Sequence, residues 1–358
     1  MKKCFYLVLL LVVFLASGCN NKKENSAGKI AKSLLMPPAS GRPYELLVVI
    51  NQDMWERPAG RALYNVLDKD VPGLPQSERS FRIMYTDPAN FDSTLKLVRN
   101  IIIVQVDETR YTQPKMSFAK DVYSAPQAIL TIQASTEASL GGFITENTNK
   151  IIDFFTTQEM NRQMQLLETD HSAFVSSKVK EMFGCDVWVP GELSSYKVGE
   201  DFCWFGTNTA TRDRNFVIYS YPYTDKNTFT LDYFLQKRDS VMKANIPGGP
   251  KGSYMTTNHD YVYVEDGTVR GKYAQIARGL WRIQGDRMGG PFVSHSRVDE
   301  ANGRVVVAEA FIYAPESLKR DLLRRMEAAL YTLQLPQQDG VVDISYNLDE
   351  IVIEPEIK

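Results

Sequence analysis

Cys19 carries the most specific chemistry in this sequence, because its thiol follows a positively charged start, an apolar run and two small residues. The apolar run, residues 4–16, is too short to cross a bilayer core of about 30 Å but has the length of a signal-peptide core. Leu15-Ala16-Ser17-Gly18 then resembles a lipobox. Small residues fit a signal peptidase, and the thiol is the nucleophile that accepts a diacylglyceryl group. We therefore expect residues 1–18 to be a lipoprotein signal peptide and Cys19 to carry the lipid, with palmitate-type acyl chains.

The residues after Cys19 suggest where the anchor lies. Asn20, rather than an aspartate, follows the cysteine, which favours sorting to the outer membrane. Residues 19–43 contain Asn, Lys, Ser, Gly and a Pro pair, so we expect the lipidated Cys and a flexible tether there. No second long apolar run follows. We expect the folded part to be tethered to the outer membrane by the lipid on Cys19, on the periplasmic face rather than the cell surface.

The other residues that could do chemistry are scattered. Cys185 and Cys203 could form a disulfide in an oxidising compartment or remain two buried thiols, and the sequence leaves both readings open. His171, His259 and His295 stand far apart, without metal-ligand spacing. There is no G-x-S-x-G or H-E-x-x-H motif, and Pro247 to Ser253 lacks the spacing of a phosphate loop. We predict no cofactor and no metal.

Composition limits the partners. The chain has 358 residues, 41 Lys and Arg, 43 Asp and Glu, and a formal net charge of −2. Nucleic-acid binding needs clustered basic residues that displace counterions, and no long basic block occurs. The composition therefore argues against nucleic acid as a partner, and the hydrophobic content of 44% is that of a folded protein.

Two features suggest a binding surface. A glycine-rich stretch has polar and apolar neighbours that could contact a ligand, namely Asp286, Arg287, Met288, Gly289, Gly290 and Phe292. The alternation around residues 216–223 places Tyr219, Tyr221 and Tyr223 on one strand face, where they could form a stacking platform for a sugar or a peptide. Each feature also has a structural explanation, a β-hairpin connection for the first and packing in a half-buried sheet for the second.

These residues must be positioned by two kinds of domain. Residues 44–168 alternate strand and helix signals, which indicates an α/β domain. The expected strands are 46–50, 81–85, 101–106 and 128–132. The expected helices are 57–67, 92–99 and a long stretch, 136–169, with one break near Gly141-Gly142.

Residues 169–335 are rich in strand signals, which indicates an α+β domain with an antiparallel sheet packed by helices. The expected strands are 187–189, 202–206, 215–223, 261–265, 272–278 and 304–313. The expected helices are 173–183, 231–244 and 315–333. Residues 336–358 form an acidic C-terminal tail whose apolar stretches, 341–344 and 351–353, could pair as edge strands or dock on a partner.

Several motifs carry a family resemblance. They are Gly73-Leu74-Pro75-Gln76, Arg99-Asn100-Ile101-Ile102, Ile246 to Pro250 with Gly252 to Met255, Gly279-Leu280-Trp281 with Met288 to Phe292, and Tyr313-Ala314-Pro315 with Lys319-Arg320. With these motifs, the mature chain resembles a family of Bacteroidetes lipoproteins, domain of unknown function 4837. The resemblance implies an envelope lipoprotein and brings no activity or catalytic residues.

The anchor, the tether and the lack of a catalytic grouping favour a non-enzymatic binding or assembly module of the cell envelope, with an envelope protein or a glycan as its partner. The alternative is an envelope hydrolase that acts on glycan or peptide through dispersed carboxylates, which would lie about 5 to 9.5 Å apart in a cleft.

Overall fold

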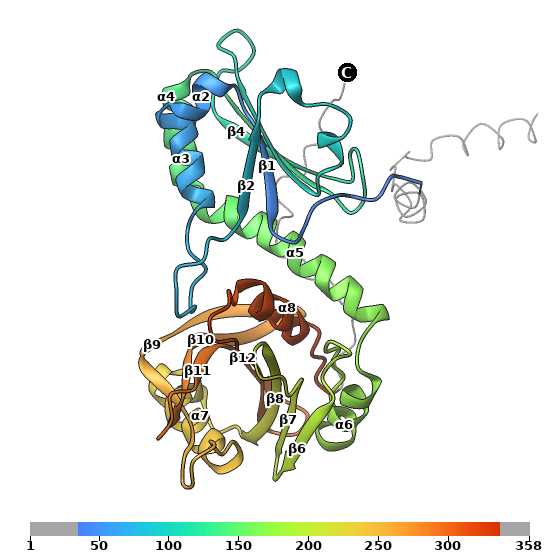
Figure 1. Cartoon of the computed structure of the whole chain (residues 1–358), viewed down its shortest axis with the longest axis vertical. Helices are drawn as coiled ribbons and strands as arrows, with labels where there is room; N and C mark the ends of the chain where they lie inside the picture. The colour runs from blue at the N-terminus through green and yellow to red at the C-terminus, as the bar shows by residue number, and fades with distance from the viewer. Residues whose placement is uncertain (1–34, 337–358) are drawn as a thin grey trace, which may run out of the picture.

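A computed structural model of the chain describes residues 35–336 (Figure 1). Within that range the chain forms two layered units, one built on a five-stranded sheet and one on a seven-stranded sheet. The predicted signal peptide, Cys19 and the apolar stretches 341–344 and 351–353 lie outside the described residues. No helix of the described part is long and apolar enough to cross a membrane.

The N-terminal sheet has the strand order β2-β1-β3-β5-β4. Its strands are β1 Glu45–Val49, β2 Arg82–Thr86, β3 Asn100–Val106, β4 Lys115–Lys120 and β5 Ala128–Ala134. The four predicted strands pair in parallel, and β4 pairs antiparallel with β5. Parallel strands covered on both faces read as continuous apolar runs. The edge strand β4, which has a lysine at each end, was not predicted.

Helices cover this sheet: α2 Gln52–Glu56, α3 Pro58–Leu67 and α4 Glu137–Glu146, with the 3-10 turns η1 Pro88–Asn90 and η2 Leu95–Leu97. The helix predicted at 92–99 is wrong. The Asp92 carboxylate accepts the amides of Thr94 and Leu95, which closes a turn, and the chain is extended again at Val98.

Helix α5, Thr148–Thr169, connects the two units, as Figure 1 shows in green. Its first half packs into the N-terminal core through Ile151, Phe154 and Phe155, whereas Met160 and Met164 join a cluster with residues of the C-terminal unit. The predicted stretch 136–169 does break once, but at Asn147 and not at the two glycines. Gly141 instead lies within the helix and faces Ala59 of α3.

The C-terminal sheet is antiparallel throughout, in the order β6-β7-β8-β12-β11-β10-β9. Its strands are β6 Ser195–Gly199, β7 Phe202–Gly206, β8 Asp213–Pro222, β9 Tyr254–Val269, β10 Lys272–Gln284, β11 Gly289–Asp299 and β12 Arg304–Tyr313. The strand predicted at 187–189 is wrong, since this segment lies outside the sheet and the Trp188 amide donates to Thr332. Strands β6 and β11 were not predicted.

Both faces of this sheet are covered by helices. They are α6 Ala173–Phe183, α7 Leu231–Asn245 and α8 Arg320–Tyr331, with the 3-10 turn η3 Lys226–Phe229. Helices α6 and α8 share one core with one sheet face, and α7 shares another core with the opposite face. Helix α8 begins at Arg320, later than the predicted 315. The predicted fold class, an α/β domain followed by an antiparallel α+β domain, is confirmed.

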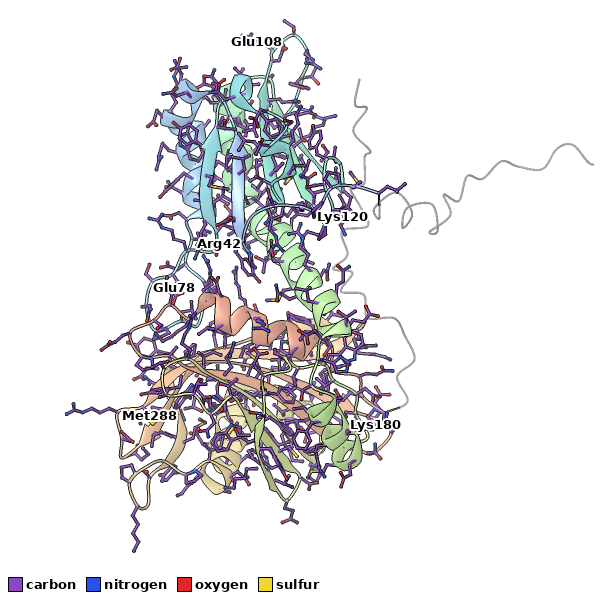
Figure 2. All side chains as sticks on the ribbon, turned by 45° about the vertical axis from the view of Figure 1, so that its right-hand side comes forward. Arg42, Glu78, Glu108, Lys120, Lys180 and Met288 are labelled. Atoms are coloured by element: carbon purple, nitrogen blue, oxygen red, sulfur yellow. The ribbon has the colours of Figure 1, made fainter. Side chains whose placement is uncertain are left out.

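Glu78 joins the two units at the start of α8 (Figure 2). Its two carboxylate oxygens accept the backbone amides of Lys319 and Arg320, at 2.7 and 2.8 Å. The N-cap residue of α8, Lys319, has no side-chain cap of its own. Because the first amides of a helix need acceptors and favour a negative charge, Glu78 caps α8 from the other unit.

Replacing Glu78 tests this contact. Glu78→Ala should lower the free energy of unfolding by about 1 kcal/mol, the typical cost of a lost cap. Urea unfolding measures the change, with Glu108→Ala, on an exposed loop of the same unit, as the matched control. Equal stability of the two variants would contradict the capping role.

Candidate functional site

The predicted tyrosine platform is buried. Tyr219 and Tyr221 are 1% and 7% exposed and belong to the core beneath α7. Tyr223 is half-buried and contacts Phe229. The alternation along β8 was read correctly, but α7 covers the face on which these tyrosines lie. The platform is therefore a wrong prediction, and its structural alternative, packing within the sheet, holds.

The glycine-rich stretch is also mainly structural. Asp286 and Arg287 are exposed at the turn from β10 to β11, and Met288 packs partly against the core beneath α7. Phe292 is fully buried, so it offers no contact surface. Gly289 and Gly290 allow close strand packing, since a Cβ on Gly290 would lie 2.0 Å from the Ile312 carbonyl oxygen. The structure thus supports the hairpin alternative and leaves Asp286 and Arg287 as the fully exposed residues of the stretch.

The three histidines do not converge. His171 bonds the Leu167 carbonyl oxygen, His259 bonds Asp239 at 2.8 Å, and His295 is buried. Within residues 35–336, no group of three or more His, Cys, Asp or Glu side chains is placed to hold a metal ion.

Cys185 and Cys203 are free, buried thiols. Burial raises the pKa of Cys185 to about 12 and that of Cys203 to about 11. Because the thiolate is the nucleophile, neither group is suited to catalysis.

The carboxyl edge of the parallel strands, where α/β sheets commonly bind ligands, is filled by its own turns. Asn51 accepts the Asp53 amide after β1, and Asp87 accepts the amides of Gln52 and Ala89 after β2. Thr136 and Ser139 form a capping box at α4. These polar groups are committed to local structure, so this edge carries no binding site that we can define.

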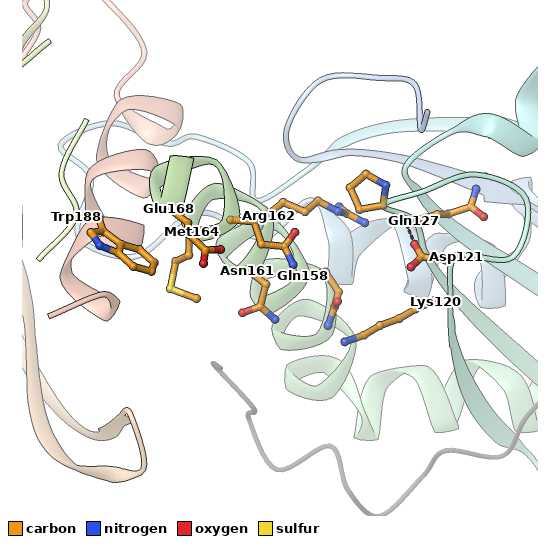
Figure 3. A pocket seen from close by; sticks show the side chains of 11 residues that line it. Lys120, Asp121, Gln127, Gln158, Asn161, Arg162, Met164, Glu168 and Trp188 are labelled. Carbon is orange, nitrogen blue, oxygen red and sulfur yellow. Dashed lines mark hydrogen bonds between the residues drawn. The ribbon is translucent and has the colours of Figure 1, made fainter. Parts of the chain in front are cut away.

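A pocket of about 190 Å³ lies instead between the two units, along the C-terminal half of α5 (Figure 3). We call it the interdomain pocket. The lining residues come from the β4–β5 turn, from α5 and from the segment before β6, and are Lys120, Asp121, Pro126, Gln127, Gln158, Asn161, Arg162, Met164, Gln165, Glu168 and Trp188. The cavity is smaller than the 300–1,000 Å³ or so of drug-sized sites, so it fits a small polar group or a short stretch of chain.

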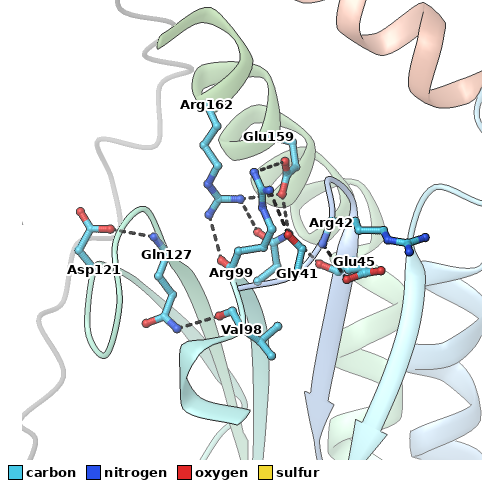
Figure 4. Close-up of polar contacts among 10 residues, drawn as sticks. Gly41, Arg42, Glu45, Val98, Arg99, Asp121, Gln127, Glu159 and Arg162 are labelled. Carbon is cyan, nitrogen blue, oxygen red and sulfur yellow. Dashed lines mark hydrogen bonds and ion pairs between the residues drawn. The ribbon is translucent and has the colours of Figure 1, made fainter. Parts of the chain in front are cut away.

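One wall of the interdomain pocket is held by a buried ionic cluster (Figure 4). The Glu159 carboxylate is fully buried and accepts from Arg99 at 2.9 Å and from Arg162 at 2.7 Å. Asn100 also donates to Glu159, at 2.7 Å, and accepts from Arg162 at 2.8 Å. Burial lowers the pKa of Arg162 more than Glu159 raises it. The cluster fixes α5 against the amino ends of the parallel strands.

Some polar groups of the pocket are satisfied and others are not. Gln127 donates to the carbonyl oxygens of Lys96 and Val98, and its backbone amide donates to Asp121 at 2.8 Å. By contrast, Asn161 Oδ1 is buried and accepts no hydrogen bond within the described chain. A buried acceptor without a donor costs about 1–3 kcal/mol, so such a group is a place where a ligand can gain affinity.

The pocket suits binding better than hydrolysis. Its lining combines three side-chain amides of α5, charged groups of both signs and the Trp188 ring. Its two carboxylates, Asp121 and Glu168, lie at opposite ends of the pocket in Figure 3 rather than as a pair across a bond to be cleaved.

The sequence contained one signal for this site. Gln158, Asn161 and Gln165 recur at helical spacing on a helix whose apolar face is narrow, so they share one side of α5. The other walls come from segments far away in sequence and could not be assigned.

The comparisons with known proteins identify domains but no activity. Residues 39–168 match the model of a Domain of unknown function (DUF8532), and no curated protein matches the chain. One similar solved structure is the Saccharomyces cerevisiae Ran-binding protein Mog1p, at 8% identity over 42% of this chain and 89% of that one, with a TM-score of 0.27. So weak a likeness carries no argument. Residues 172–332, the C-terminal unit, match the model of a Domain of unknown function (DUF4837), which is the domain that the motifs predicted.

Proposed function

We propose that the protein is a lipid-anchored, non-enzymatic binding module of the cell envelope, and that the interdomain pocket is its binding site. The observation that carries the proposal is Asn161 Oδ1, a buried acceptor without a donor in a cavity walled by both units. A rigid junction supports the pocket, because Glu78 and the Glu159 cluster fix the helices on either side. Preorganised polar groups of this kind bind without the cost of ordering the site.

The anchor is proposed from Cys19 and from where the described chain begins. The Ala125 amide donates to the Pro37 carbonyl oxygen, and the Ala39 amide donates to that of Ala125, both at 3.0 Å. The next residue, Pro126, lines the pocket. Residues 19–34 span at most about 50 Å when extended, so a lipid on Cys19 would hold the pocket within that distance of the membrane. We place the anchor in the outer membrane, with the body on its periplasmic face.

A photo-crosslinking amino acid at Gln165, which lines the pocket and is exposed, tests the proposal in living cells. We expect an envelope adduct that falls about fivefold when Asn161→Leu removes the acceptor, the effect of about 1 kcal/mol. The control places the same probe at Tyr261, which is 63% exposed on β9. Cys19→Ser should release the protein from the membrane fraction. Equal adducts at both positions, insensitive to Asn161→Leu, would reject the pocket as the site.

A further inference from the structure

We propose that the interdomain pocket binds an extended peptide strand through the amides of α5, and that its occupant is the chain's own C-terminal segment, residues 337–358. This inference rests on the proposed function, because the segment would occupy the same site until an envelope partner displaces it. It has three supports: the spacing of the amides, the unpartnered acceptor, and the place where the described chain ends.

The three amides form a ladder. Gln158, Asn161 and Gln165 lie on one side of α5, and their Cα atoms span about 10 Å along a helix that rises 1.5 Å per residue. An extended strand presents an N–H and a C=O on the same side at every second residue, about 6.6 to 6.8 Å apart. A primary amide supplies both a donor and an acceptor. The rise from Asn161 to Gln165 is about 6 Å, close to this repeat, whereas that from Gln158 to Asn161 is about 4.5 Å. Asn161 and Gln165 can therefore pair with successive backbone positions of an extended strand, and Gln158 extends the polar side of the helix.

The pocket contains matching groups for such a strand. Asn161 Oδ1 lacks a donor, which a backbone N–H would supply. Met164 and Trp188 give apolar walls for a side chain beside the ladder. At the far end, Lys120 is exposed and forms no salt bridge with residues 35–336. Figure 3 shows Lys120 and Gln158 facing the same opening.

The end of the described chain lies close to the Trp188 end of the pocket. Thr332 bonds the Trp188 backbone, and Gln334 exchanges two backbone hydrogen bonds with Asp186, at 2.7 and 3.0 Å. The pocket follows α5 over residues 158–168, about 15 Å. The 22 residues after Pro336 reach about 70 Å when extended, which is enough to turn back and lie along the ladder.

The segment also has suitable chemistry. Its apolar stretches, 341–344 and 351–353, have the β-branched composition of strands. Its charged side chains are six acidic residues and one lysine, which complements the Lys120 end of the pocket. Because the segment is tethered, its effective concentration at the pocket is of millimolar order, so even weak pairing would be populated.

Disulfide trapping in the full lipid-anchored chain, purified in detergent, tests the inference. Gln165→Cys is combined with single cysteines placed in turn at positions 338–358. Trapping should be strongest at alternate positions between 341 and 353, because alternate residues of a strand face the same side. The buried native thiols have raised pKa values and should not compete. The matched control moves the pocket thiol to the exposed β9 edge with Tyr261→Cys.

Trapping that is equal for Gln165→Cys and Tyr261→Cys, or absent from both, would overturn the inference. Protection of the thiol introduced by Gln165→Cys from alkylation by an added N-acetylglucosamine tetramer would also overturn it, in favour of a glycan ligand. A partner captured in cells by the probe at Gln165, with no trapping of the segment, would leave the proposed function standing and reject only this occupant.

Discussion

Arg238→Met should destabilise the protein by about 3–5 kcal/mol, because it leaves the Glu309 carboxylate charged and unpaired in the core. Both side chains are fully buried, Arg238 on α7 and Glu309 on β12. The guanidinium donates twice to Glu309, at 2.6 and 2.9 Å, and once to Thr257 at 2.8 Å. Burial lowers the pKa of Arg238, but the charge of Glu309 and its hydrogen bonds raise it by more, so the pKa lies above its ordinary value. The pair therefore fixes α7 to the sheet as an ion pair.

The double variant distinguishes the loss of the ion pair itself from the cost of leaving one buried charge unpaired. Arg238→Met with Glu309→Leu replaces both ions by apolar side chains of similar size, so most of the lost stability should return. Urea unfolding of the wild type, both single variants and the double variant gives the coupling energy. A loss below about 1 kcal/mol in Arg238→Met would show that Glu309 is not charged in the folded state.

The sequence was informative wherever one segment determines its own structure. Helix α6 has the predicted bounds, because Ser172 accepts the Val175 amide at its start and Gly184 is left-handed at its end. Strand β3 contains the continuous apolar run Ile101 to Val104 and is buried over most of its length. Where partners lie on distant elements the sequence was silent. Strand β11 carries Ser294 to Arg297, polar residues that are buried because helices cover both faces of the sheet, α8 on one side and α7 on the other.

The binding site was beyond prediction for the same reason. The pocket joins the β4–β5 turn, α5 and Trp188, which are brought together only by the packing of α5 and α8. For the tyrosines of β8, the sequence predicted a binding surface where none is exposed. Alternation identifies a strand face but does not show that α7 covers it. Two of the quoted motifs, Gly73 to Gln76 and Lys319-Arg320, lie at the junction of the units, where Lys319 donates to Gln76 at 2.9 Å. The first lies within the residues that match DUF8532 and only the second within the DUF4837 match, so the resemblance was drawn too widely over the N-terminal unit.

His295 should make the stability fall below neutral pH. The ring is fully buried on β11, meets the Tyr331 ring edge to face at 4.7 Å, and forms no hydrogen bond with the described residues. Burial lowers its pKa to about 3, and Arg278 and Arg297 act in the same direction against Glu327. The folded protein therefore keeps this imidazole neutral at pH values where the unfolded chain protonates it.

The unfolded chain protonates His295 below pH 6.5, whereas the folded protein does so only near pH 3. Keeping the ring neutral therefore costs no stability above pH 6.5, and the free energy of unfolding falls as the pH drops from 6.5 towards 3. The slope is about 1.4 kcal/mol per pH unit, or about 2 kcal/mol lost at pH 5. His295→Leu should flatten that slope, while its stability at pH 8 reports the packing change alone. Urea unfolding of both proteins from pH 8 to pH 5 measures the difference, and parallel profiles would mean that His295 is protonated in the fold or that the site hydrates on acidification.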